Sequence, residues 1–192
     1  MYELFDAAQA LANQPPMDGE GIAIVTNAGG MGVIATDFAN DLGLKLADLT
    51  PETLEEIRKA CPPTWNPGNP VDIIGDADTA RYANVLTAVG KDPAVKAIMV
   101  IAARQAATNL FQIAKWIAIT ARISGKPTVA CFAGIFDQES EQFLDSRGIP
   151  VMSVPERGMT ALHALSERGK WLKKKGVDLP KRAPNGWNDI PE

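Results

Sequence analysis

Residues 21–37, GIAIVTNAGGMGVIATD, decide the fold of this chain. The stretch opens with Ile22–Val25, an apolar run without polar alternation, which is typical of a strand buried on both faces. Polar residues and glycines follow from Thr26 to Gly32, and apolar residues then return at the spacing of a helix. The stretch therefore predicts a buried strand, a tight turn and the beginning of a helix.

The turn has the composition of an anion site. The first N–H groups of a helix lack intrahelical partners and lie at the positive end of the helix dipole. Gly29, Gly30 and Gly32 have no Cβ atoms to keep an anion away from these groups. Asn27 adds an amide that can donate to an oxyanion. A plain tight turn would use the same glycines, so the spacing leaves both interpretations open; neither G-x-G-x-x-G nor the P-loop ending GK[ST] is present.

Composition describes an ordinary acidic protein. The chain has 192 residues, 46% of them hydrophobic, which suffices for one well-buried domain with tails. A net charge of −4 argues against nucleic acid as a partner, and two cysteines do not suggest a disulfide framework. The sequence shows neither a membrane-spanning apolar run nor a secretion signal, so we expect a cytoplasmic protein without a membrane partner.

Strand and helix patterns alternate along the rest of the chain. After the first strand, strands are expected at Leu44–Ala47, Ala97–Ile101, Thr128–Phe132 and Gly148–Met152, and helices are expected to begin near Thr50, Asp78, Leu110, Gln138 and Pro155. Such alternation requires right-handed crossovers and a parallel sheet covered on both faces. The sequence therefore predicts an α/β fold, a flavodoxin-like doubly wound parallel five-stranded sheet, in which ligands bind at the carboxyl ends of strands. Three turns fall there: Asn27–Gly32, Ala102–Thr108 and Ala133–Phe136.

Three segments are expected: an N-terminal helix and linker (residues 1–17), the flavodoxin-like domain (18–176) and an extended C-terminal tail (177–192). In the first segment, apolar residues at helical spacing predict an amphipathic helix from Glu3 to Ala12; they are Tyr2, Leu4, Phe5, Ala8 and Leu11. This helix lies outside the strand–helix alternation, so it could pack on the domain or face a partner. Between Trp65 and Asp76 we expect a long irregular loop, of the kind that is functional or mobile.

Two separated motifs resemble the NDP-forming acyl-CoA synthetases. These are AIVTNAGGMGV at Ala23–Val33 and GNPVD at Gly68–Asp72, and the strand Lys96–Ile101 is also similar. The best-known members of this family are the ADP-forming acetyl-CoA synthetases, relatives of succinyl-CoA synthetase. The resemblance covers Leu4–Lys173 and implies the second flavodoxin-like ligase-CoA domain of a multidomain enzyme. That enzyme interconverts acyl-CoA, NDP and phosphate with acid, CoA and NTP.

The resemblance also assigns roles to the turn. In the family, two helix N-termini stabilise a phosphohistidine, and the helix that opens here is similar to one of them. The implied phosphate-binding residues are Ala28, Gly29, Gly30, Met31 and Gly32. Asn27 matches an asparagine that contacts the carboxylate substrate.

Two further loops match family positions. Gln105, Ala106 and Ala107 occupy the loop that supplies a second contact to the acid in the succinyl enzymes. This loop departs from their glycine-containing pattern, so the acid is not specified. Asn69, Pro70 and Asp72 belong to the GNPVD signature, to which the sequence assigns no role.

Several parts of the complete enzyme are missing from the sequence. The only histidine, His163, is expected to be a surface or partly packed helix residue, because the family's phosphohistidine lies in the other flavodoxin-like domain. We therefore expect no catalytic residue, no metal site and no tightly bound cofactor; phosphate, CoA and ADP or ATP are implied as substrates of the complete enzyme. The implied partners are the CoA-binding, phosphohistidine and ATP-grasp domains, in the same or another chain, and a small carboxylic acid. Alone, the chain should be inactive.

Two other functions fit the fold. The first is a non-catalytic regulatory or assembly module that has kept the architecture and lost the chemistry. The second is a flavodoxin-like FMN carrier, but the hydroxyl-rich phosphate loop that FMN requires is absent from the sequence.

Overall fold

The computed structural model describes residues 2–65, 67–134 and 137–181. In chain order the elements are α1 (Tyr2–Asn13), β1 (Ile22–Thr26), α2 (Gly29–Asp41), α3 (Pro51–Ala60), β2 (Val71–Asp72), α4 (Thr79–Lys91), β3 (Ala97–Ala102), α5 (Leu110–Ser124), β4 (Thr128–Phe132), α6 (Gln138–Asp145), β5 (Val151–Met152) and α7 (Pro155–Lys174). The strands form one parallel sheet in the order β2-β1-β3-β4-β5. This is the flavodoxin-like order, so the predicted fold class is confirmed.

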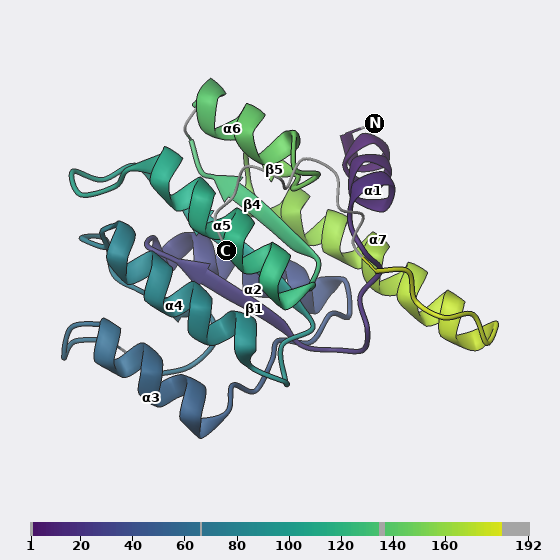
Figure 1. Cartoon of the computed structure of the whole chain (residues 1–192), viewed down its shortest axis with the longest axis horizontal. Coiled ribbons are helices and arrows are strands. Elements are labelled where there is room, and N and C mark those ends of the chain that lie inside the picture. The colour runs from purple at the N-terminus through teal and green to yellow at the C-terminus, as the bar shows by residue number, and fades with distance from the viewer. Residues whose placement is uncertain (1, 66, 135–136, 182–192) are drawn as a thin grey trace.

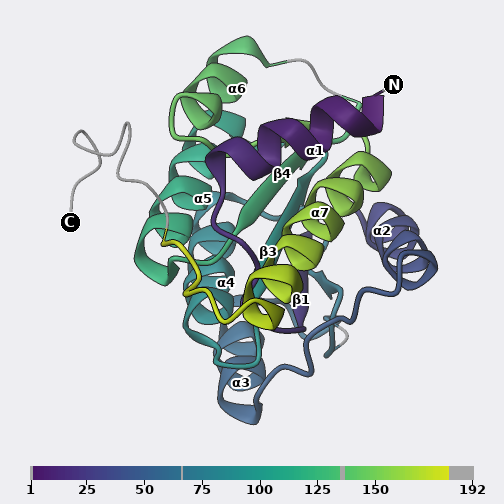
Figure 2. The same ribbon diagram turned by 90° about the vertical axis from the view of Figure 1, so that its right-hand side faces the viewer.

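Helices cover both faces of the sheet (Figures 1 and 2). Alternate residues of β3 point to opposite sides: Ile98 and Val100 join the core beneath α4 and α5, whereas Met99 and Ile101 join the core beneath α2 and α7. All residues of β1, β3 and β4 are buried, as the uninterrupted apolar runs predicted. The predicted helix starts after Thr50 and Asp78 are also confirmed, each with a side-chain N-cap.

The predicted strand at Leu44–Ala47 is wrong. This segment makes only an isolated parallel bridge to Ile22, whose N–H donates to the Lys45 carbonyl at 2.9 Å. The edge position beside β1 belongs instead to β2, which pairs with the last two residues of β1. β2 comes from the stretch that was expected to be irregular.

The Asn69 side chain explains this exchange of partners along the edge of β1. Its Oδ1 accepts from the Ile24 N–H at 3.0 Å. Its Nδ2 donates to the carbonyls of Ile22 and Ala47, at 2.8 and 3.0 Å. The amide therefore takes the place of a backbone peptide between the 44–47 segment and β2, and the chain can leave the edge of β1 without orphaning its polar groups.

Helix α1 is confirmed, but its apolar side faces outward. Asp6, on the inner side, is only 2% exposed and pairs with Arg157 of α7. The side chains of Leu4 and Phe5 are 71% and 64% exposed. Partners for polar side chains, and not the apolar pattern, therefore decide which face of this helix packs. The helix lies beside α7 (Figure 2).

Replacing Asn69 by alanine should lower the free energy of unfolding by roughly 2–4 kcal/mol, because the Ile24 N–H and the Ala47 carbonyl lose their partner and the Ile22 carbonyl keeps only the Ala47 N–H. Denaturant unfolding followed by circular dichroism measures this change. Asn84→Ala on the exposed side of α4 is the matched control, with an expected change under about 0.5 kcal/mol. Equal unfolding midpoints for the two variants would contradict the role given to Asn69.

Candidate functional site

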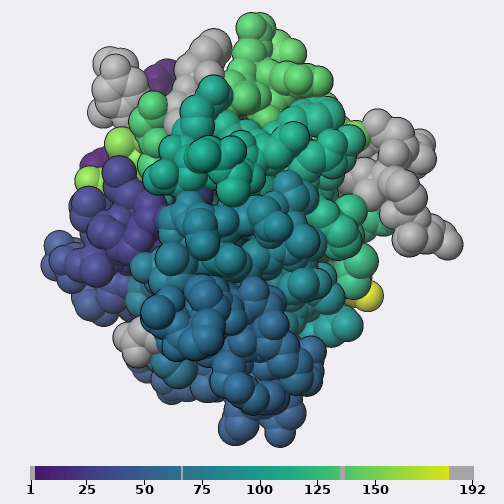
Figure 3. Space-filling model, turned by 90° about the vertical axis from the view of Figure 1, so that its left-hand side faces the viewer, coloured from purple at the N-terminus to yellow at the C-terminus, as the bar shows by residue number. Residues whose placement is uncertain are grey.

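The carboxyl ends of β1 and β3 are tied together by the Asn27 side chain. Its Nδ2 donates to the Ala103 carbonyl at 2.9 Å, and its Oδ1 accepts from the Ala103 N–H at 2.8 Å. Beneath them, the Tyr82 hydroxyl donates to the Ile101 carbonyl at 3.1 Å and accepts from the backbone N–H of Asn27. Burial raises the pKa of Tyr82, so the hydroxyl stays protonated and able to donate. The start of α2 and the 103–109 loop are thereby held at one edge, which Figure 3 views directly.

Helix α2 begins without a side-chain cap. Ala28 is its N-cap residue, and the N–H groups of Met31 and Gly32 donate to the Ala28 carbonyl at 2.9 and 3.2 Å. The N–H groups of Gly29 and Gly30 precede these bonds, at the positive end of the dipole. Gly30 is exposed, and a Cβ atom built on it meets nothing within 4 Å. Among the described residues, this helix start has the backbone of an anion site.

The glycines of the turn serve different purposes. A Cβ on Gly32 would lie 3.1 Å from Cγ2 of Thr26 and 3.3 Å from Cβ of Pro70. Gly32 therefore allows α2 to pack closely on β1 and on the GNPVD segment without displacing Thr26 or Pro70. Close packing therefore accounts for Gly32 without any ligand. It does not account for Gly30, whose lack of a side chain fits the anion interpretation.

Asp72, to which the sequence assigns no role, places a carboxylate beside this helix start. A Cβ built on Gly29 would lie 2.4 Å from Oδ2 of Asp72, while Oδ1 of Asp72 accepts from the Ile74 N–H at 3.0 Å. Ile74 has a φ of 68°, which is strained for a β-branched residue and typical of functional segments. An anion at Gly29 would meet the Asp72 charge as well as the open amides. Only the register of β2 beside β1 reveals this proximity.

The predicted acid-binding loop belongs to a separate hollow. Gln105, Ala106 and Ala107 are exposed and line a cavity of about 570 Å³ between the starts of α5 and α6. Its charged residues include Arg104 and Asp137, whose nearest charged atoms are 3.6 Å apart. Neither Asn27, which is 2% exposed, nor the start of α2 lines this cavity. The structure thus brings the predicted residues to one edge, in two adjoining places.

The third predicted turn, Ala133–Phe136, is only partly described, because residues 135–136 lie outside the described residues. Ala133 directly follows β4, and its N–H donates to the Ala102 carbonyl at 3.1 Å. His163 is half-buried on α7. Within the described part of the chain, no group of three or more Asp, Glu, His or Cys residues is arranged to hold a metal ion, and no helix is long and apolar enough to cross a membrane.

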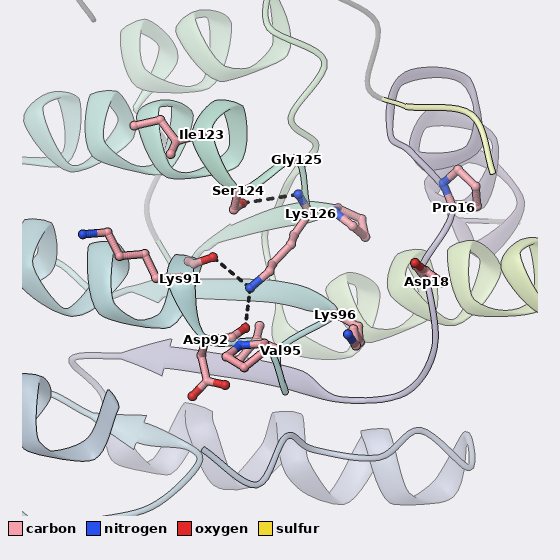
Figure 4. Close-up of a pocket in the computed structure, with 13 residues that line it drawn as sticks. Pro16, Asp18, Lys91, Asp92, Val95, Lys96, Ile123, Ser124, Gly125 and Lys126 are labelled. Atoms are coloured by element: carbon pink, nitrogen blue, oxygen red, sulfur yellow. Dashed lines mark hydrogen bonds between the residues drawn. The ribbon is translucent and has the colours of Figure 1, made fainter. Parts of the chain in front are cut away.

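A second cavity, of about 520 Å³, lies at the opposite edge of the sheet, before β3 and β4 (Figure 4). Across it, Nζ of Lys126 donates to the carbonyls of Gly90 and Asp92 at 2.8 and 2.6 Å. These carbonyls lie at the end of α4, so the lysine caps that helix. Burial lowers the pKa of Lys126 to about 8. We assign this cluster a structural role.

The fold and the open start of α2 define a doubly wound α/β domain with a candidate anion site at the carboxyl edge of its sheet. Residues 22–176 match the family model described as the Ligase-CoA domain. The chain belongs to this family.

Two relatives are named as ADP-forming ligases. The chain is 37% identical, over 178 residues, to the alpha subunit of acetate–CoA ligase [ADP-forming] I from Pyrococcus furiosus, covering 90% of this chain and 38% of that subunit. It is 33% identical to 4-hydroxybutyrate–CoA ligase [ADP-forming] from Nitrosopumilus maritimus, covering 90% of this chain and 25% of the ligase. The chain thus spans between a quarter and two fifths of these relatives.

A solved structure has the same fold. It is the apo form of dinucleotide-forming acetyl-coenzyme A synthetase 1 from Candidatus Korarchaeum cryptofilum, with a TM-score of 0.83 and 31% identity over 93% of this chain and 40% of that chain. The same enzyme in complex with phosphate and ADP matches with a TM-score of 0.82. The resemblance inferred from the two sequence motifs is confirmed.

The lowered pKa of Lys126 predicts a pH dependence of stability. Between pH 8 and the ordinary lysine pKa of 10.5, the unfolded lysine binds more protons than the folded one, so the free energy of unfolding contributed by this group rises with pH. Between pH 7.5 and pH 9.5, the free energy of unfolding of the wild type should rise by roughly 1 kcal/mol relative to that of Lys126→Met, after allowance for the partial exposure of Lys126. Denaturant titrations at both pH values measure the gain, with exposed Lys91→Met as control. If the free energies of unfolding of Lys126→Met and of the wild type changed equally with pH, the lowered pKa of Lys126 would be contradicted.

Proposed function

We propose that this chain is the part of an ADP-forming acyl-CoA synthetase that supplies its phosphate and carboxylic-acid site. The complete enzyme interconverts acyl-CoA, NDP and phosphate with acid, CoA and NTP. In this proposal the start of α2 receives the phosphoryl group, carried on a histidine of another domain. The observation that carries the proposal is the uncapped helix start, where the N–H groups of Gly29 and Gly30 are available at the positive end of the dipole.

The relatives support this assignment. Their names state ADP-forming acid–CoA ligation, and one solved relative was obtained with phosphate and ADP. Because the matched region is a minor share of each relative, we propose that CoA binding, the phosphohistidine and the ATP-grasp function come from other domains. The chain alone then has no turnover and no tightly bound cofactor, and it works in the cytoplasm.

The acid is proposed to bind between Asn27 and the 103–109 loop. The bonds to Ala103 engage the Asn27 oxygen and one N–H, and Nδ2 also lies 3.5 Å from Oγ1 of Thr108. A bound carboxylate would accept the remaining N–H in place of this long contact. The neighbouring cavity lined by Gln105–Ala107 has room for the rest of a small acid.

Phosphate binding at α2 tests the proposal. Inorganic phosphate should shift the amide NMR signals of Gly29 and Gly30, and Gly30→Val should weaken binding at least about tenfold, because the new side chain covers open amides without a clash in the fold. The matched control is Ala80→Val, which places the same side chain at the exposed second position of α4 and should leave the phosphate affinity unchanged. Unshifted Gly29 and Gly30 signals at saturating phosphate would sink the proposal.

A non-catalytic assembly module is the second candidate, and the Asp72 carboxylate beside Gly29 favours it, because a like charge opposes an incoming anion. Asp72→Asn separates the two functions. The amide keeps an acceptor for the Ile74 N–H and removes one charge, so phosphate affinity should rise about three- to tenfold. Isothermal titration of wild type and variant measures the ratio. If Asp72→Asn bound phosphate and the wild type did not, the chain would be a module that has lost the anion site. Equal phosphate affinities of the two proteins would place the bound phosphate away from α2.

A further inference from the structure

Lys126 is a nucleophilic side chain that the proposed function does not use. It lies just before β4, is half-buried, and lines the cavity of about 520 Å³ at the opposite edge of the sheet from α2. Figure 4 shows its side chain extending across this cavity, with Nζ between the carbonyls of Gly90 and Asp92, at 2.8 and 2.6 Å. A small molecule in the cavity would therefore lie beside a lysine nitrogen held in a fixed place.

Burial has opposite effects on a lysine and on a cysteine, because it disfavours the charged form of each. The nucleophilic form of a thiol is charged, so burial raises the pKa of Cys131 to about 12 and makes this thiol inert. The nucleophilic form of a lysine is the neutral amine, and burial lowers the pKa of Lys126 to about 8. At pH 8 about half of such lysines are neutral, against roughly 0.3% at the ordinary pKa of 10.5.

The charged groups around the cavity favour a small anion. Lys91 and Lys96 line it together with Lys126, and the charge of Lys96 lowers the pKa of Lys126 further. Two carboxylates, Asp18 and Asp92, also line it, and the charge of Asp92 raises that pKa. Asp18 is engaged in an ion pair with a lysine of α7, and Asp92 accepts two backbone N–H groups. An acyl phosphate combines small size and negative charge with a carbonyl carbon that an amine can attack.

The two hydrogen bonds of Nζ make the fold sensitive to a change at this atom. A neutral amine keeps two N–H donors, so the bonds to the Gly90 and Asp92 carbonyls survive loss of the proton. An amide formed at Nζ has only one N–H. Acylation therefore removes this partner from one of the two carbonyls, at the end of α4.

We propose that Lys126 is an acylation site whose acyl donor is a small acyl phosphate, and that acylation loosens the junction between the end of α4 and the start of β4. The nitrogen attacks the acyl carbon, so that a C–N bond forms and the C–O bond to phosphate breaks. Phosphate leaves with that electron pair, and the amine proton passes to solvent. This inference goes beyond the proposed function. It concerns the other edge of the sheet, so failure of phosphate to bind at α2 would leave it standing.

Acetylation rates at individual lysines test the site. The purified chain is incubated with acetyl phosphate over a range of pH, and mass spectrometry of its peptides gives the rate at each lysine. At pH 8 Lys126 should react at least about fivefold faster than Lys91, which is exposed and lines the same cavity. The rate at Lys126 should level off above pH 8, whereas a lysine of ordinary pKa gains about tenfold per pH unit until pH 10.5.

Two results of this experiment would overturn the site. One is a rate at Lys126 no higher than that at Lys91, and the other is a rate at Lys126 that still rises about tenfold per pH unit well above pH 8. Acetyl-CoA at the same concentration tests the donor. Slower acetylation of Lys126 by acetyl-CoA than by acetyl phosphate is expected, and the reverse order would overturn the choice of acyl phosphate.

Lys126→Arg tests the loosened junction. Arginine keeps a positive charge and N–H donors for the two carbonyls, and it stays protonated and so does not become acetylated. Treatment with acetyl phosphate should lower the Tm of the wild type by about 3–8 °C more than that of the variant, because only the wild type loses a donor to these carbonyls. Equal changes in Tm would overturn the loosening. The wild-type rates decide the acylation site whether or not the variant folds.

Discussion

Strand β1 must satisfy every backbone N–H and C=O because it is buried on both faces, and this constraint governs the region around it. On one side β3 pairs with all five residues in regular parallel register. On the other side no single strand does so: the 44–47 segment, the Asn69 amide and β2 follow one another along the edge. The Asn69 amide, which makes hydrogen bonds that a neighbouring strand would otherwise make, is the least replaceable part of this edge.

The same constraint shapes the candidate site. Because β2 joins β1 only at its carboxyl end, Asp72 comes to lie beside Gly29, and Pro70 comes to lie against Gly32. The candidate anion site and the carboxylate beside it are thus products of one pairing. A carboxylate beside the open amides would lower the affinity of that site for an anion.

Helix α1 shows how polar contacts can override an apolar pattern. Burying Leu4 and Phe5 would contribute about 1.5–3 kcal/mol for each side chain. Against this stand the ion pair between the buried Asp6 carboxylate and Arg157, and the anchoring of Gln14 by two backbone groups. In this structure the polar contacts of Asp6 and Gln14 decide the orientation of α1, and Leu4 and Phe5 stay exposed.

The sequence by itself determined the doubly wound fold, because apolar runs such as Ile98–Ile101 and caps such as Thr50 act locally and agree with one another. It also determined the open helix start, since the absence of a Cβ at Gly30 is a property of the residue. Only the tertiary structure decided the edge strand, the inward role of Asn69, the proximity of Asp72 to Gly29 and the outward face of α1. Each of these depends on contacts between residues far apart in the chain: Asn69 with Ile24, Asp6 with Arg157. Spacing along a sequence encodes the period of an element, and it carries no information about which neighbour will meet each face.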